Sequence, residues 1–150
     1  MAEGTVRSTV TTASPATVFG VASDLESYPD WVTGVNEVEI LEADAAGRAR
    51  RARFEVEGFI KRISYELLYE YDEPSRISWT AVPGDDIEEM AGSYDFVEVE
   101  GEGTEILYAL RVETAFPVPG FLRRQAEKQI ITSALRALKQ RAERFEDAET

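Results

Sequence analysis

The middle of this chain is dominated by short segments in which apolar and polar residues alternate. The clearest runs from Ile63 to Tyr71, where the odd-numbered residues are apolar or aromatic and the even-numbered ones are mostly polar. Such alternation is typical of a strand with one buried and one wet face. Comparable segments lie at 4–12, 35–41, 49–58, 77–82, 88–99 and 104–114. Because short breaks join them, we expect one antiparallel sheet of about seven strands.

Helical signals flank this sheet on both sides. Ser14 is a favourable helix cap and Pro15 a favourable first helical residue, so a short helix should begin there, with a second over Leu25–Trp31. From Leu122 to Phe145, apolar residues recur every four positions, which predicts one long amphipathic helix. We therefore expect a single α+β domain over residues 1–150: a curved antiparallel sheet around a long C-terminal helix, with two short helices between the first and second strands.

Histidine and cysteine are both absent from the 150 residues. Their absence excludes Ser-His-Asp and Cys-His nucleophiles, Cys/His zinc sites and disulfides. An acidic cluster at 85–89 does not follow a calcium-loop spacing and is interpreted as a solvated loop. We therefore expect no metal site and no cofactor, and any catalysis would depend on tyrosine, arginine, lysine, carboxylate or hydroxyl groups.

The charge is strongly acidic overall but unevenly distributed. A formal net charge of −13 repels phosphate backbones, so we expect no nucleic-acid partner. Residues 121–145, however, carry seven basic and only two acidic side chains. This basic segment has two interpretations, namely internal charge complementarity with the acidic body, or a docking strip for an acidic partner or an anionic lipid surface.

The sequence has neither a signal-like apolar run at its start nor the roughly 20 consecutive apolar residues of a membrane span. We therefore expect a cytoplasmic protein without a transmembrane segment, for which transient membrane contact remains open. The sequence makes no prediction of the oligomeric state.

Several local motifs resemble a known superfamily. They are ASPATVFGVASDLESYPDWVTGVNEVEIL at 13–41, Trp79 in a short strand, the Gly92-x-Tyr94 spacing, Gly103-Thr104, and the final helix after VPGF at 118–121. Together they resemble the START-like, Bet v 1-like (SRPBCC) helix-grip superfamily, and within it the bacterial polyketide cyclase/dehydrase group. The resemblance implies a ligand cavity between the sheet and the long helix. Members include lipid carriers, quinone-binding chaperones, hormone receptors and aromatic polyketide cyclases, so the fold leaves the function open.

The residues expected on the inner face are apolar or aromatic, and five of them are Tyr or Trp with a polar tip. Apolar walls with a few polar tips suit a small-molecule pocket, although a solid core is the alternative. The candidate ligand-binding residues are Phe54, Val56, Tyr65, Leu67, Tyr69, Trp79, Met90, Tyr94, Phe96, Ile106, Tyr108, Leu110, Ile130, Ala134 and Leu138. Tyr28 and Trp31 are candidates either for a gate at the cavity mouth or for a packing anchor.

Catalytic candidates are fewer. Arg50 shares the parity of the inward residues of its strand, which makes it the best candidate for a buried cation. With Tyr65, Tyr69 and Tyr108 it could supply proton-transfer and oxyanion groups. No cyclase residue set can be matched position by position, so we predict binding or transport of a hydrophobic small molecule: a lipid, an isoprenoid quinone or a polyketide. The alternatives are a polyketide cyclase, aromatase or dehydratase, and a docking module that uses the basic C-terminal helix.

Overall fold

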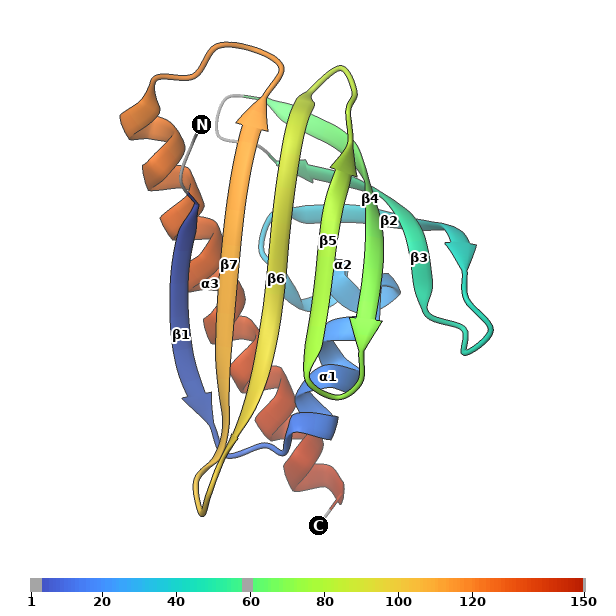
Figure 1. Ribbon diagram of the computed structural model, residues 1–150, viewed down its shortest axis with the longest axis vertical. Helices are drawn as coiled ribbons and strands as arrows, with labels where there is room; N and C mark the ends of the chain where they lie inside the picture. Colours follow the sequence, from blue (N-terminus) through green and yellow to red (C-terminus); the bar gives the residue numbers. More distant parts are fainter. Residues whose placement is uncertain (1–3, 58–60, 150) are drawn as a thin grey trace.

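The computed structural model of the chain describes residues 4–57 and 61–149, with side chains through residue 147. One seven-stranded sheet curves around the helices, which lie on one of its faces (Figure 1). The strands are β1 (Thr5–Thr11), β2 (Val35–Ala43), β3 (Ala49–Glu57), β4 (Arg62–Asp72), β5 (Arg76–Val82), β6 (Ile87–Val99) and β7 (Gly103–Thr114). The helices are α1 (Pro15–Ser23), a single 3₁₀ turn (Leu25–Ser27), α2 (Tyr28–Trp31) and α3 (Gly120–Glu149).

The sheet is antiparallel throughout and has the order β1-β7-β6-β5-β4-β3-β2. Strands β2 to β7 therefore follow each other as a meander, and β1 adds to the free edge of β7. This arrangement confirms the predicted α+β helix-grip architecture. The long helix extends beyond the predicted 122–145, and Gly58 of the predicted third strand lies outside the described residues.

Two glycines allow close approaches that hold the sheet together. Gly103, at the β6–β7 turn, has a φ of +111°, and a Cβ there would lie 2.1 Å from the Thr11 carbonyl oxygen. The corner of β1 and α1 is thus held against β7, where the Thr104 hydroxyl donates to the Ala13 carbonyl at 2.7 Å. Gly92 pairs with Trp79 across the sheet, and a Cβ at Gly92 would lie 2.4 Å from the indole.

The first helix begins as the sequence predicts. Ser14 caps α1 by accepting a hydrogen bond from the Thr17 amide at 3.3 Å, and Pro15 occupies the first turn. The buried face of α1 presents Phe19, whose ring meets Tyr71 and Phe96 edge to face. This helix therefore fills the concave face of the sheet at the end where β1 finishes.

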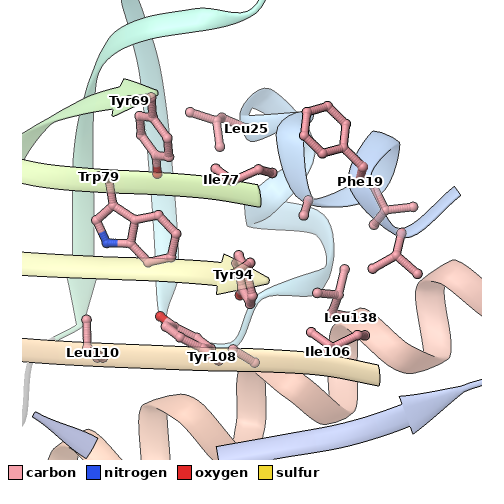
Figure 2. Close-up of a cluster of buried hydrophobic side chains, with 14 of the residues drawn as sticks. Phe19, Leu25, Tyr69, Ile77, Trp79, Tyr94, Ile106, Tyr108, Leu110 and Leu138 are labelled. Carbon is pink, nitrogen blue, oxygen red and sulfur yellow. The ribbon is translucent and has the colours of Figure 1, made fainter. Parts of the chain in front are cut away.

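Helix α3 runs along β1 and β7 on the concave side of the sheet (Figure 1). Its buried stripe includes Ile131, Leu135, Leu138 and Ala142. Figure 2 shows how Leu138 meets the aromatic and aliphatic side chains of the sheet and of α1. No helix in the described part of the chain is long and apolar enough to cross a membrane.

Candidate functional site

A cavity of about 480 Å³ lies between the sheet and the N-terminal half of α3. Its volume falls within the usual range of about 300–1,000 Å³ for small-molecule sites. The sheet contributes residues from β3, β4, β6 and β7, and the wall is completed by the β7–α3 connection and by the segment 32–35 after α2. The wall is largely apolar, and its aliphatic members include Val32, Val35, Ile63, Ile87, Val112, Val118, Leu122 and Ala126.

Eight of the fifteen candidate ligand-binding residues lie in this wall: Phe54, Val56, Tyr65, Met90, Tyr94, Tyr108, Ile130 and Ala134. The other candidates are buried in the core outside the described cavity wall: Leu67, Tyr69, Trp79, Phe96, Ile106, Leu110 and Leu138. Figure 2 shows all of these except Leu67 and Phe96 as labelled side chains. The two groups share one face of the sheet. On β4 and β6 they occupy successive stretches of the strand, whereas on β7 Leu110 lies between Tyr108 and Val112 of the wall. Where α1 and the C-terminal half of α3 pack on the sheet, the space is filled, and the cavity begins beyond them.

Three tyrosine hydroxyls give the apolar wall its polar tips. The rings of Tyr94 and Tyr108 lie 4.5 Å apart, and Tyr65 stacks on Phe54 at 5.5 Å. Burial raises the pKa of each of these three tyrosines, so their hydroxyls stay protonated at neutral pH. Among the described residues, the hydroxyls of Tyr28 and Tyr71 hydrogen-bond to the protein, and both lie outside the wall. The hydroxyls of Tyr65, Tyr94 and Tyr108 have no hydrogen-bond partner among the described residues. The cavity tyrosines can therefore donate hydrogen bonds to a ligand.

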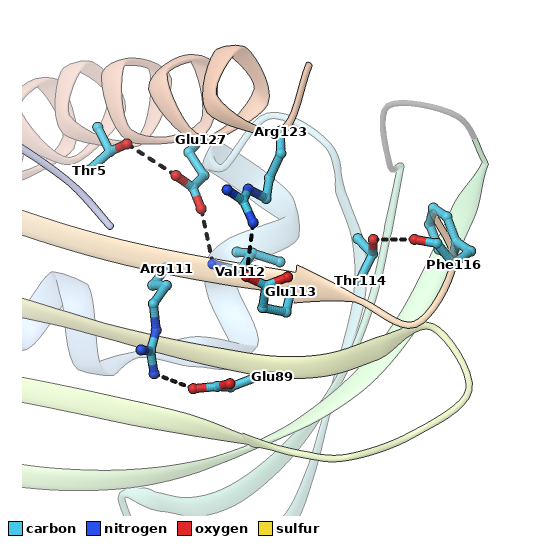
Figure 3. A network of polar contacts seen from close by, with 9 residues as sticks. All are labelled: Thr5, Glu89, Arg111, Val112, Glu113, Thr114, Phe116, Arg123 and Glu127. Atoms are coloured by element: carbon cyan, nitrogen blue, oxygen red, sulfur yellow. Dashed lines mark hydrogen bonds and ion pairs between the residues drawn. The ribbon is translucent and has the colours of Figure 1, made fainter. Parts of the chain in front are cut away.

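One side of the cavity carries charged groups that the sequence analysis did not select. Glu127 is only 2% exposed, and its two oxygens accept from the Thr5 hydroxyl at 3.1 Å and from the Val112 amide at 3.0 Å (Figure 3). Arg123, one turn earlier on α3, donates from Nη1 to Glu113 at 2.8 Å. The Nε of Arg123 is buried and has no partner among the described residues.

The register of the sheet explains the position of Glu127. Strand β1 pairs with β7 from Thr5 opposite Leu110 onward, so the Val112 amide lies beyond the first described pair. Glu127 supplies the acceptor there, which avoids an unpaired buried donor. A sequence signal for this residue existed, because Glu127 falls four positions before Ile131 on the apolar stripe of the helix.

Arg50 does not provide the buried cation that its parity suggested, because its side chain is exposed. The partners of β2 change from Glu42 opposite Arg51 to Ala43 opposite Ala49, so Arg50 is the extra residue of a β-bulge. The bulge places Ala49 on the buried face instead. The prediction of an inward Arg50 is therefore wrong.

Tyr28 and Trp31 lie next to the cavity but not in its described wall. The Tyr28 hydroxyl donates to the Ala22 carbonyl, and its ring meets Trp31 edge to face at 5.2 Å. The Arg141 guanidinium lies 6.0 Å from the Trp31 ring. These contacts anchor α2 between α1 and α3, and they place the following residues 32–35 at the cavity wall. A gating role for the two aromatics stays a prediction.

The described residues contain no cluster of three or more acidic side chains placed to hold a metal ion. In the acidic segment 85–89, Asp86 pairs with Lys61 at 3.0 Å and accepts from the Ser64 amide at 2.9 Å. These two hydrogen bonds lower the pKa of the Asp86 carboxyl. The contacts join the β5–β6 turn to the start of β4.

A curved sheet around a long helix, with an apolar cavity between them, defines the helix-grip class of ligand-binding domains. Residues 1–143 match the family model described as polyketide cyclase/dehydrase and lipid transport. The chain therefore belongs to the polyketide cyclase/dehydrase and lipid transport family. No curated protein matches the sequence at a significant level.

Solved structures share the fold over nearly the whole chain. A START superfamily protein from Mycobacterium smegmatis superposes with a TM-score of 0.86 at 23% identity, covering 96% of this chain and 99% of that one. The Zhui aromatase/cyclase from a Streptomyces species superposes with a TM-score of 0.82 at 16% identity, covering 95% of this chain and 94% of that one. A protein from Thermus thermophilus superposes with a TM-score of 0.78 at 24% identity, covering 93% of this chain and 96% of that one. At these identities the likeness concerns the fold.

Proposed function

We propose that this protein binds or transports a hydrophobic small molecule in the cavity between the sheet and α3. The observation that carries the proposal is a cavity of about 480 Å³ with a mainly apolar wall. Burial of apolar ligand surface in the cavity favours binding by roughly 25 cal/mol of free energy per Å² of surface removed from water. The hydroxyls of Tyr65, Tyr94 and Tyr108 favour a ligand with a few oxygen atoms, such as an isoprenoid quinone, a polyketide or an oxygenated lipid.

Native mass spectrometry on protein freshly purified from its own host tests this proposal directly. We expect a stoichiometric mass adduct that is lost on denaturation, since an apolar cavity of this size favours an occupant over water. The mass of the released molecule would identify its chemical class. If the protein is bare and also fails to take up a neutral fluorescent apolar probe such as N-phenyl-1-naphthylamine, the binding function is refuted.

A second candidate is cyclase or aromatase activity on a poly-β-keto substrate. It is favoured by the presence of Arg123 and Glu127 in the same wall as Tyr65 and Tyr108. An arginine and protonated phenols can stabilise an enolate, and a carboxylate can accept a proton. The similarity to an aromatase/cyclase of known structure agrees with this candidate without establishing it.

Conversion of a poly-β-keto thioester to a cyclised aromatic product without added cofactor would test the cyclase candidate. We expect Tyr108→Phe and Tyr65→Phe to lower the rate at least about tenfold, because each removes a hydroxyl that faces the substrate. Tyr69→Phe is the matched control, because Tyr69 is buried outside the described cavity wall. Undiminished rates in both cavity variants would refute this candidate, and a loss confined to Tyr69→Phe would point to a different reaction site.

A further inference from the structure

The cavity wall contains one buried carboxylate that no cation neutralises. Three charged residues occur in the described wall, namely Glu57, Arg123 and Glu127. Glu57 pairs with Arg62 at 3.0 Å, and Arg123 pairs with Glu113 at 2.8 Å. Among the described residues, Glu127 receives only the neutral donors of Thr5 and Val112. The side of the cavity bounded by α3 and β7 therefore holds a buried carboxyl group without a salt-bridge partner among the described residues.

Glu127 also has unused hydrogen-bonding capacity. An ionised carboxylate has about four lone-pair sites, and the protein fills one on each oxygen. A ligand hydroxyl or ammonium can donate to the remaining sites. A ligand carboxylate at the same place would bring two like charges together in a poorly solvated space. Their repulsion makes binding weaker.

We propose that the cavity selects amphipathic ligands whose head group is a neutral or cationic hydrogen-bond donor, and that Glu127 discriminates against carboxylate head groups. This inference rests on the proposed binding function and specifies the ligand class. It favours long-chain alcohols, hydroxylated polycyclic compounds, quinols and amines over fatty acids. Arg123 pairs with Glu113 through Nη1, and its buried Nε, which has no partner among the described residues, is the one charged donor in the described wall that acts against this preference.

Displacement of N-phenyl-1-naphthylamine by three probes that share one alkyl chain tests the selection. The probes are 1-dodecanol, dodecylamine and dodecanoate, used at pH 8 and at an ionic strength that screens the net charge of −13. We expect dodecanoate to bind at least about tenfold more weakly than dodecanol, which corresponds to about 1.4 kcal/mol. Equal or tighter binding of dodecanoate would overturn the inference and leave the binding function intact. If no probe binds, the binding function fails together with the inference.

Three variants test whether Glu127 causes the selection against carboxylate head groups. Glu127→Gln removes the buried charge and should shrink the gap between dodecanol and dodecanoate. Glu89→Gln is the matched control, because it removes the same charge from an exposed pair with Arg111 and should leave the gap unchanged. Should Glu127→Gln fail to fold, Glu113→Gln leaves Arg123 without its partner and should strengthen dodecanoate binding severalfold. A gap that persists undiminished in folded Glu127→Gln protein would overturn the role of Glu127. If that variant does not fold, an unchanged gap in Glu113→Gln would show that the charge balance on this side of the cavity does not set the selection, which would overturn the inference as well.

Discussion

Ala134 contributes one of the smallest side chains in the cavity wall and lies in the middle of α3. It is 7% exposed, so a larger side chain at this position must enter the cavity or displace the sheet. We expect Ala134→Trp to abolish uptake of N-phenyl-1-naphthylamine because the indole occupies the ligand's space. Overpacking typically costs about 1–3 kcal/mol, which is less than the roughly 5–15 kcal/mol stability of most domains, so the variant should still fold.

Thr132→Trp provides the matched control for this substitution. Thr132 is exposed on the same helix and does not lie in the described wall, so the same bulk there should leave probe uptake unchanged. Thermal unfolding followed by circular dichroism establishes that both variants are folded. Equal uptake by the two variants would contradict the position of the ligand against α3.

At the scale of single elements, strand periodicity predicted the buried face but not the position of the cavity along it. Tyr65 and Tyr69 lie on the same face of β4, yet Tyr65 is in the cavity wall and Tyr69 packs against Trp79 at 5.8 Å in the core. The difference arises from tertiary contacts, because the rings of Trp79, Tyr71 and Phe54 surround Tyr69. Alternation within one strand contains no information about these contacts.

Two local departures from regularity explain the remaining differences. The bulge at Arg50 inserts one residue into β3 just after the turn that contains Gly47, and that turn does not reveal the extra residue in the sequence. Glu127 is hidden for another reason, because the net charge of the basic segment 121–145 gives no sign of a single carboxylate on the apolar stripe. A charge on an otherwise buried helix face is a signal that sequence analysis alone can use.

The contacts of α3 also bear on the two interpretations of its basic residues. Arg123 pairs with Glu113, and Lys139 pairs with Glu143 at 3.0 Å while donating to the Val10 carbonyl at 2.8 Å. Internal complementarity therefore accounts for these two cations, which join the helix to the sheet edge. Arg124, Lys128 and Arg136 are exposed, so a docking role for this part of the helix remains a separate prediction.

At the scale of the whole molecule, the six tyrosines of the cavity and the core make the stability of the fold depend on pH under alkaline conditions. The pKa of every one of them is raised, mainly by burial. In the unfolded chain they lose their protons near the ordinary value of 10.0, whereas in the folded protein they keep them. Their contribution to stability is therefore complete below pH about 10 and is lost as the pH rises above it.

We expect alkaline unfolding to be cooperative and coupled to tyrosine ionisation. Tyrosinate absorbance and far-ultraviolet circular dichroism, followed together during a pH titration, should change in one transition above pH about 10, because the buried phenols ionise only when the core opens. Tyr71→Phe is a useful comparison, because the Tyr71 hydroxyl donates to the Ala49 carbonyl at 2.7 Å and lies outside the cavity wall. This variant should lose one tyrosinate signal while the remaining five still ionise together. Reversible ionisation near pH 10 with unchanged circular dichroism would show that the tyrosines are solvated, and it would contradict the burial that raises their pKa values.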